Sequence, residues 1–221
     1  MDTNTREAML YEKLGDSVVR CHVCQWQCTI RPQKYGLCQV RQNKDGILYI
    51  LNYGEVSSVA VDPIEKKPLF HFYPTSMVFS LGGWGCNFHC KHCQNWQISC
   101  QAPREEKHDS QQISPENSIE LAKRYNCEGI AWTYNEPAIW LEYTLDSAKL
   151  AKAAGLYTVY VTNGYSTPEA LDTIGPYLDA WRVDIKGFSD TLYKSLAKIP
   201  QWRGILDVAK RAKQKWNMHV E

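Results

Sequence analysis

Three cysteines at C-x3-C-x2-C spacing are the residues of this sequence best suited to chemistry. Cys86, Cys90 and Cys93 follow an apolar run at positions 77–81 and a glycine-rich turn. Thiolates are soft ligands that suit iron–sulfur clusters, and the common clusters take four cysteines. A compact set of three therefore leaves one iron open, as a catalytic zinc site leaves a position open for substrate. Zinc, or three thiols that are merely close, is the alternative, and the context favours the cluster.

A second cysteine group lies near the N-terminus, at C-x2-C-x3-C-x9-C spacing. Its members fall within eighteen positions and are Cys21, Cys24, Cys28 and Cys38. Four thiolates close a metal site, which suits structural zinc. A second iron–sulfur cluster is the rival, since four thiolates also hold one. Pro32 and Gly36 place turns inside the segment, and this turn-rich layout favours zinc.

The bulk composition excludes several protein classes. The chain has 221 residues, and its 25 Lys and Arg against 24 Asp and Glu give a net charge of +1, so nucleic acid and anionic membranes are not indicated as partners. There is no apolar run of about 18 residues and no apolar signal segment within positions 1–20. We expect a soluble, cytoplasmic protein. In a reducing compartment, nine cysteines indicate metal ligands, although Cys127 is expected to be a buried hydrophobe and Cys100 a loop thiol.

From position 77 onward, short apolar runs alternate with helical periods, which predicts an α/β fold of parallel strands joined by helical crossovers. Ser114 and Thr167 have the chemistry of helix N-caps, and Pro200 breaks the last helical segment. The expected strands cover 77–81, 129–134, 157–161, 180–186 and 217–221. The expected helices cover 115–125, 138–154, 168–174 and parts of 190–216.

The N-terminal third reads as a small β module followed by a connector. We expect a short helix at 8–14, a hairpin turn at Asp45 and Gly46, and a strand at 56–61. An irregular aromatic connector at 64–74 follows. Its Lys66, Lys67 and His71 could reach a site at the barrel mouth, but ordinary exposure favours solvated lysines and a packed histidine. The predicted division is therefore 1–75 for the cysteine-rich module with its connector and 76–221 for the α/β core.

Polar side chains recur where the expected parallel strands end. Asn135 and Glu136 follow the second strand, Asn163 follows the third, and Asp184 and Lys186 end the fourth. Ligands bind at this rim in barrels and open parallel sheets, because loops and helix N-termini converge there. Taken singly, Asn163 could serve a turn, and Asp184 with Lys186 could form a surface ion pair. Their recurrence predicts one binding site.

These motifs resemble the radical S-adenosylmethionine (SAM) enzymes and, within them, the AmmeMemoRadiSam proteins, which are similar to pyruvate formate-lyase activating enzymes. The resemblance is carried by both cysteine groups and by the segments 62–68, 85–88 and 133–137. It implies a partial (β/α) TIM-type barrel with a small N-terminal cysteine-rich β module. Family members continue past the fifth strand, so the resemblance also implies a barrel truncated at strand five.

The resemblance assigns a cofactor role to each of the singled-out residues. A [4Fe-4S] cluster on Cys86, Cys90 and Cys93 would bind SAM at its open iron and cleave it to a 5′-deoxyadenosyl radical, which abstracts hydrogen from a protein or other substrate. Further SAM contacts would come from His92 near the adenine, Glu136 at the amino group, Lys186 at the carboxylate, Asp184 in an Asp-x-Lys motif, and the amides of Asn135 and Asn163.

The resemblance also implies partners, and two other functions remain open. The implied partners are a glycyl radical enzyme or AmmeMemo-system proteins as substrate, and flavodoxin or ferredoxin as electron donor. The first alternative is a non-catalytic interaction module with zinc at both cysteine groups. The second is a fragment that binds SAM without turnover. The unequal ligand count of the two groups, four and three, favours catalysis over the zinc module.

Overall fold

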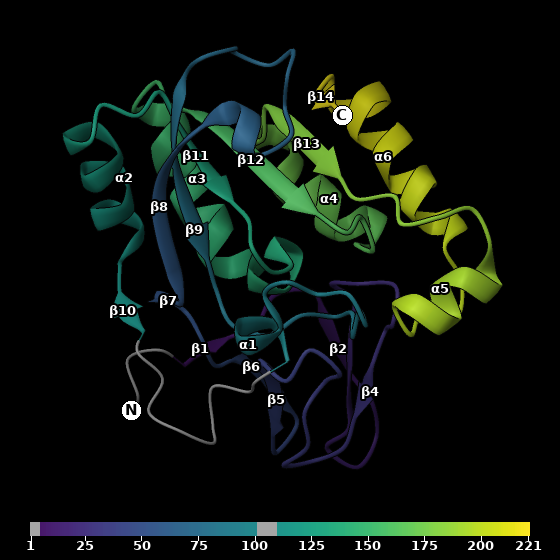
Figure 1. Cartoon of the computed structure of the whole chain (residues 1–221). Helices are drawn as coiled ribbons and strands as arrows, with labels where there is room; N and C mark the ends of the chain where they lie inside the picture. Colours follow the sequence, from purple (N-terminus) through teal and green to yellow (C-terminus); the bar gives the residue numbers. More distant parts are fainter. Residues whose placement is uncertain (1–4, 101–109) are drawn as a thin grey trace.

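A six-stranded sheet forms the centre of the computed structural model, which describes residues 5–100 and 110–221 (Figure 1). The strand order is β14-β13-β12-β11-β9-β8. The five strands from β9 to β14 are parallel, and β8 pairs antiparallel with β9. Their bounds are Ser58–Pro63 for β8, Met77–Gly82 for β9, Gly129–Trp132 for β11, Tyr157–Thr162 for β12, Ala180–Val183 for β13 and His219–Val220 for β14. The five predicted strands are therefore present in one parallel array.

The helices follow the expected crossovers. The Ser114 and Thr167 hydroxyls accept hydrogen bonds from Asn117 N and Ala170 N, both at 3.1 Å, so both predicted N-caps are confirmed. The break near Pro200 is also confirmed. The helices are α1 (Trp96–Ser99), α2 (Pro115–Arg124), η2 (Pro137–Trp140), α3 (Leu141–Ala153), α4 (Pro168–Ile174), η3 (Gly175–Tyr177), α5 (Asp190–Leu196) and α6 (Arg203–Trp216).

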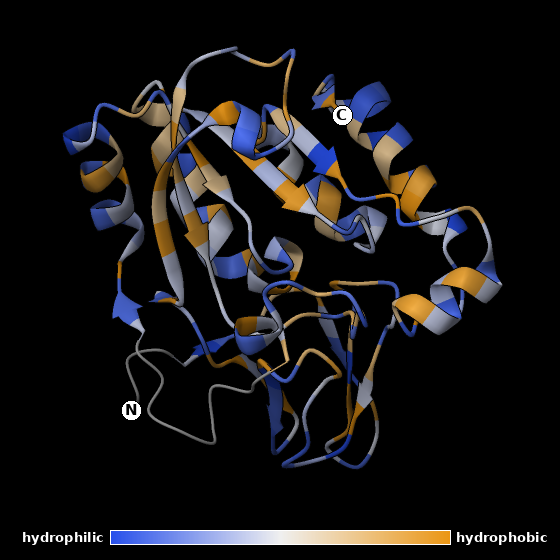
Figure 2. Cartoon of the chain, viewed as in Figure 1, coloured by the Kyte–Doolittle hydropathy of each residue, from blue (hydrophilic) through white to orange (hydrophobic). Residues whose placement is uncertain are grey.

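Alternate residues of the sheet face two different cores. We call the face of the sheet that packs on the helices the outer face and the opposite one the inner face. Outer-face side chains such as Phe79, Trp132 and Trp181 belong to the large core that includes the helices. Inner-face side chains of the same strands, Val78, Ala131 and Val159 among them, pack against a separate set from the connector, which is Ile64, Leu69 and Phe72. Figure 2 shows the strands as largely hydrophobic and α6 as carrying both kinds of residue. The connector therefore covers part of the inner face of the sheet.

Short strands make up the N-terminal region. The turn at Asp45 and Gly46 joins two of them with positive φ at both residues, which confirms the predicted hairpin. The helix predicted at 8–14 is wrong, because residues 11–13 pair with residues 19–21 instead, and strand pairing overrides local helix propensity. The strands are β1 (Arg6–Glu7), β2 (Tyr11–Lys13), β3 (Val19–Cys21), β4 (Thr29–Ile30), β5 (Arg41–Lys44), β6 (Ile47–Ile50) and β7 (Glu55–Val56), which pairs with β10 (Gln111–Gln112).

The connector differs from expectation in two places. The Lys66 side chain is 68% exposed, as predicted, but that of Lys67 is only 3% exposed and lies 2.8 Å from Asp62. His71 is exposed beside Glu221 rather than packed. A 3-10 turn, η1 (Ile64–Lys66), follows β8 and directs the chain over the sheet. The domain boundary predicted near residue 75 falls between β8 and β9, two strands that pair along their whole length.

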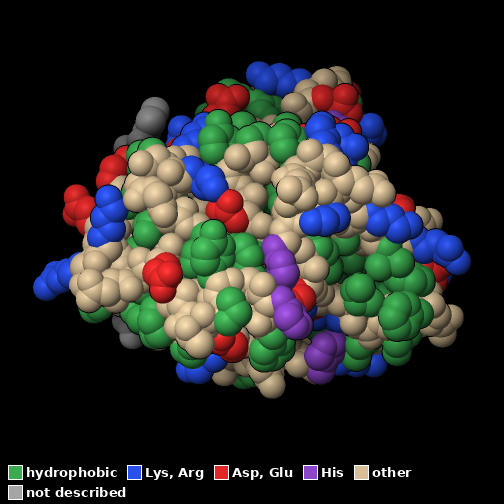
Figure 3. All heavy atoms as spheres, turned by 90° about the horizontal axis from the view of Figure 1, so that it is seen from above, with side chains coloured by type: hydrophobic (Ala, Val, Ile, Leu, Met, Phe, Trp, Pro, Cys, Tyr) green, Lys and Arg blue, Asp and Glu red, His purple; other side chains and the backbone are tan. Residues whose placement is uncertain are grey.

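A buried ion pair joins the N-terminal region to the core. Arg41 Nη2 lies 2.6 Å from Glu142 Oε2, and both side chains are 2% exposed. The same carboxylate accepts a hydrogen bond from Met9 N, and Arg41 also donates to Ile139 O. By contrast, charges of both signs are scattered over the surface seen in Figure 3. In the described residues, no helix is both long and apolar enough to cross a membrane.

Neutralising Glu142 should separate the effect of this buried pair from that of a surface pair. Glu142→Gln leaves the Arg41 charge buried without an anion, which costs about 3–5 kcal/mol in the free energy of unfolding. The matched control is Glu12→Gln, which breaks an exposed pair with Arg20 and should cost less than about 1 kcal/mol. Urea denaturation measures both values. Equal losses in the two variants would contradict the structural role of the Arg41–Glu142 pair.

Candidate active site

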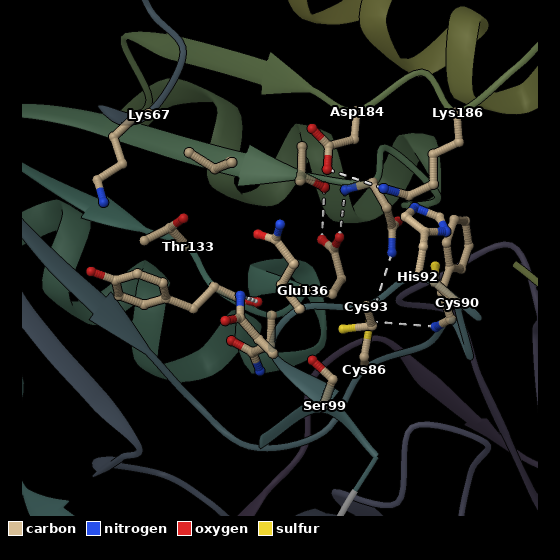
Figure 4. A pocket seen from close by; sticks show the side chains of 18 of the residues that line it. Lys67, Cys86, Cys90, His92, Cys93, Ser99, Thr133, Glu136, Asp184 and Lys186 are labelled. Carbon is tan, nitrogen blue, oxygen red and sulfur yellow. Dashed lines mark hydrogen bonds and ion pairs between the residues drawn. The ribbon is translucent and has the colours of Figure 1, made fainter. Parts of the chain in front are cut away.

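A cavity of about 440 Å³ lies at the C-terminal ends of the parallel strands (Figure 4). Its walls come from the loop after β9, the ends of β11, β12 and β13, and the connector. All nine of the residues that the sequence analysis placed at a cluster and SAM site line it, namely Cys86, Cys90, His92, Cys93, Asn135, Glu136, Asn163, Asp184 and Lys186. The structure therefore gathers the predicted set around one space.

Asn135 fixes the start of the loop that carries the three cysteines, which we call the cluster loop (residues 83–95). Its side-chain oxygen accepts a hydrogen bond from Gly83 N at 3.1 Å, and its side-chain nitrogen donates to Gly85 O at 2.8 Å. Asn95, at the other end of the loop, donates to Tyr134 O at 2.8 Å. Asn135 thus positions the cluster loop, whereas the resemblance gave it a cofactor contact.

Gly85 lets the cluster loop pass against the N-terminal region. Its φ is +79°, and a Cβ built on it would lie 2.5 Å from Cys38 O and 2.8 Å from Val40 Cγ1. Both conditions require glycine, because other residues rarely adopt this φ and the space is filled. Trp26 strengthens the same contact through a 2.8 Å hydrogen bond from its indole nitrogen to Asn87 O. The two cysteine groups are therefore neighbours in the fold.

Two N–H groups are directed at the Cys86 sulfur. Phe88 N lies 3.4 Å from Cys86 Sγ, and Asn163 Nδ2 lies 3.9 Å from it while donating to Asn87 Oδ1 at 2.7 Å. Burial raises the pKa of the Cys86 thiol, and the nearby Glu136 raises it further. N–H donors favour a thiolate, although burial disfavours it. A cation bound at the Cys86 sulfur would lower the pKa of this thiol and so favour the thiolate.

Glu136 joins the ends of two neighbouring strands. Its carboxylate accepts hydrogen bonds from Ala138 N at 2.9 Å, Thr162 Oγ1 at 2.7 Å and Asn163 N at 2.8 Å. Complete burial raises the pKa of Glu136 to about 7, although these three donors lower it. A carboxylate has about four acceptor positions, so one is left toward the cavity. That position can receive one ammonium hydrogen.

At the end of β13, one acidic side chain pairs with two basic ones. Asp184 lies 2.6 Å from Arg182 Nη1 and 3.1 Å from Lys186 Nζ, so the ion pair that is the alternative to a binding role is present. Lys186 lowers the pKa of Cys90, opposing the larger effect of burial, which raises it. This end of the cavity therefore combines thiols with an ammonium group that has further donors to offer.

The four N-terminal cysteines line a small cavity of their own, beside Arg41. Burial raises the pKa of Cys21, Cys24 and Cys38, the last to about 12. Within residues 5–100 and 110–221, no group of three or more His, Cys, Asp or Glu side chains is arranged to hold a metal ion. A zinc ion needs its sulfurs within roughly 4 Å of one another, given bonds of about 2.3 Å. The described residues thus form no ready-made site for a single metal ion at either cysteine group.

The surroundings of the three cysteines of the cluster loop are of the kind found at iron–sulfur clusters. A cluster is larger than one ion and takes its thiolates on different irons, so it does not require three touching sulfurs. The donors toward Cys86 Sγ are of the kind that tune cluster sulfurs. Cys100 is exposed at the end of α1, and Cys127 is buried, as predicted. The donor set thus consists of three thiols facing one cavity.

A family model described as the Radical SAM superfamily matches residues 83–219 of this chain. The chain belongs to the radical SAM superfamily. Membership implies a [4Fe-4S] cluster and SAM as cofactors. It accounts for three cysteines where a closed cluster would need four. The matched region includes every residue that lines the cavity except Lys66 and Lys67 of the connector.

Two curated proteins and one solved structure are similar to this chain. An uncharacterized protein of Methanocaldococcus jannaschii, MJ0808, is 47% identical over 95% of this chain, which spans 61% of that relative's length. The putative glycyl-radical enzyme activating enzyme MJ1632 of the same organism is 28% identical over 48% of this chain and 38% of its own length. The crystal structure of QueE from Escherichia coli matches 75% of this chain and 92% of that chain, with a TM-score of 0.43 and 11% identity.

From the sequence, solvent exposure is favoured over a place at the site for the connector lysines, and Thr133 and Tyr134 are not among the predicted site residues. Lys66, Lys67, Thr133 and Tyr134 also line the cavity. The charged residues that follow β8 could have indicated the connector side of the cavity, but charged residues are usually exposed to solvent. Only the fold over the inner face of the sheet brings Lys67 to the cavity.

Gly85→Ala tests whether the cluster loop depends on its contact with Cys38. The control is Gly155→Ala, because Gly155 has a similar φ of +76° but no atom within 4 Å of its added Cβ. The control should cost about 1–2 kcal/mol from backbone conformation. Gly85→Ala should cost a further 1–3 kcal/mol, roughly, from overpacking and should reduce the iron retained after reconstitution. Thermal unfolding and iron analysis measure both effects, and identical behaviour of the two variants would contradict the contact.

The protonation of Glu136 should make the free energy of unfolding depend on pH. Its pKa in the folded chain is about 7, above its ordinary value of 4.5, so the folded state holds a proton that the unfolded state releases. The stabilisation is complete below pH 4.5 and is lost as the pH rises to 7, by about 3 kcal/mol. Glu136→Gln should lack this part of the slope in urea titrations between those pH values. An unchanged slope in the variant would show that Glu136 is not the group responsible.

Proposed function

We propose that this protein is a radical SAM enzyme of the AmmeMemoRadiSam type that removes a hydrogen atom from its substrate. The observation that carries the proposal is the shared cavity, in which three thiols face a buried acid and a lysine on neighbouring strand ends. When bound, the cluster supplies the electron that cleaves SAM reductively to a 5′-deoxyadenosyl radical. The residues of this chain bind and orient SAM and the substrate.

Each predicted residue of the cavity has a role in this proposal, and that of Asn135 is to position the cluster loop. Cys86, Cys90 and Cys93 would hold the cluster. The acceptor position left on Glu136 suits the ammonium group of SAM, and the free donors of Lys186 suit its carboxylate. Asn163 acts on the cluster loop through Asn87 and Cys86, and its amide would contact SAM as well. The exposed ring of His92 at the cavity wall would lie near the adenine. Asp184 holds Lys186 in place.

A protein substrate is one part of this proposal. MJ1632 is named as a putative glycyl-radical enzyme activating enzyme, and its likeness over about half of this chain supports a glycyl radical enzyme as partner. AmmeMemo-system proteins are the other candidate partners, and flavodoxin or ferredoxin would be the electron donor. We place the protein in the cytoplasm, where thiols stay reduced.

The four N-terminal cysteines form a proposed second metal site. Their shared cavity supports the proposal, as does the position of this cavity beside the cluster loop, with Asn87 among its lining residues. Iron–sulfur and zinc remain its two candidate occupants. Measuring the zinc and iron contents of the unaltered protein and of a Cys24→Ala variant would assign the occupant. The metal whose content falls in the variant is the one bound at this site.

Anaerobic reconstitution with iron and sulfide tests the proposed function. The purified protein should be brown, bleach on reduction and form 5′-deoxyadenosine from SAM. Cys90→Ala should abolish 5′-deoxyadenosine formation, because one cluster ligand is lost. Cys127→Ala is the matched control, because Cys127 is buried at the opposite end of β11, and it should retain both iron and activity.

Two results would overturn the proposal in different ways. A colourless protein that binds two zinc ions and forms no 5′-deoxyadenosine would instead be a non-catalytic interaction module. A brown protein that binds SAM but never cleaves it would be a binding fragment without turnover.

A further inference from the structure

The connector places positive charge at the far side of the cavity from the cysteines. Figure 4 shows Lys67 across the pocket from Cys90 and Lys186, with Glu136 between them. Lys67 reaches this place because Ile64 and Leu69 pack against the inner face of the sheet. The cavity of about 440 Å³ thus has two chemically different ends, one carrying thiols and the other carrying lysines.

One carboxylate serves two lysines at this end. Asp62 Oδ1 accepts from Lys66 Nζ at 3.2 Å, while Asp62 Oδ2 accepts from Lys67 Nζ at 2.8 Å and from Tyr134 Oη at 3.2 Å. These donors hold the pKa of Asp62 at about 2 although burial opposes them, so the acid is ionised at neutral pH. Among the described residues, Asp62 is the acid paired with either lysine. Lys66 is 68% exposed and is screened by water, so the buried charges at this end are the ammonium group of Lys67 and the carboxylate of Asp62.

Lys67 has donor capacity left for a ligand. Its side chain is 3% exposed, and its Nζ lies 4.8 Å from the centre of the Tyr134 ring as well as against Asp62. An ammonium group has three hydrogens, of which one is used by Asp62 and one faces the ring. Burial lowers the pKa of Lys67 and Asp62 opposes this, so a second anion at the ammonium group would further favour its charged form. Lys67 lines the cavity, so its third hydrogen is available to an anion bound there.

Tyr134 is held in a strained conformation beside this lysine. Its φ is +72°, in the left-handed region, which costs other residues than glycine about 1–2 kcal/mol. Asn95 of the cluster loop binds Tyr134 O, and Asp62 accepts from its hydroxyl. Strain of this kind persists where the surroundings fix a functional conformation. Tyr134 therefore links the lysine end of the cavity to the cluster loop.

We propose that Lys67, supported by Asp62, Lys66 and Tyr134, forms the substrate subsite and binds an anionic group, a carboxylate or a phosphate, of the molecule that loses hydrogen. The inference rests on the proposed function, because SAM would occupy the end near the cysteines and leave the lysine end for the molecule that loses hydrogen. The anionic group would hold that molecule across the cavity from the cluster.

Anion titration of the reconstituted full chain tests the subsite. Inorganic phosphate and acetate are the two probes, at constant ionic strength, with thermal stability as readout. At least one probe should stabilise the unaltered protein, and the stronger one indicates which anion the site prefers. Lys67→Met should raise its dissociation constant about tenfold or more, equivalent to about 1.4 kcal/mol. Lys152→Met is the control, because Lys152 pairs with one aspartate on the surface, and should leave the constant unchanged.

A labelling experiment covers the case in which Lys67→Met does not fold. Acetic anhydride should modify Lys67 of the unaltered protein more slowly when the stabilising probe is present, as measured by peptide mass spectrometry, while labelling of Lys152 stays the same. Equal stabilisation of the Lys67→Met variant, stabilisation by neither probe, or no protection of Lys67 would overturn the subsite. Formation of 5′-deoxyadenosine by the unaltered protein is measured in parallel, since its absence would contradict the proposed function and not anion binding.

Discussion

The arrangement of the site depends on a buried carboxylate that ties two strand ends together. Glu136 lies in the segment after β11, and its carboxylate accepts hydrogen bonds from Thr162 and Asn163 at the end of β12. Asn163 in turn donates to Asn87 in the cluster loop, whose backbone oxygen accepts from Trp26 of the N-terminal region. Four parts of the chain far apart in sequence are thus fixed by one chain of hydrogen bonds. Each link is short-ranged and directional, so the cysteines cannot shift independently of the strand ends.

The sequence predicted the site because its signals are local. Cysteine spacing, helix caps at Ser114 and Thr167, and polar residues after apolar runs depend on neighbours along the chain. Parallel strands then bring their C-terminal ends to one edge, so the residues gather without further information. This is why all nine predicted residues line one cavity, including His92 and Lys186, which lie almost a hundred positions apart.

The features that escaped prediction depend on long-range packing. Lys67 lies in a polar run and gives no sign of burial, yet the connector folds over the inner face and takes it out of solvent. Residues 8–14 have helical composition, but pairing of Tyr11 with Cys21 makes a strand there. The antiparallel addition of β8 to the parallel sheet likewise follows from tertiary contacts. No local pattern encodes these choices.

Electron paramagnetic resonance of the reduced protein tests most directly whether the three-cysteine site holds a cluster that binds SAM. The account predicts the signal of a reduced [4Fe-4S] cluster that changes shape when SAM is added, because the iron without a protein ligand acquires one. A signal that is unaffected by SAM, or no cluster signal from protein reconstituted with iron and sulfide, would contradict it.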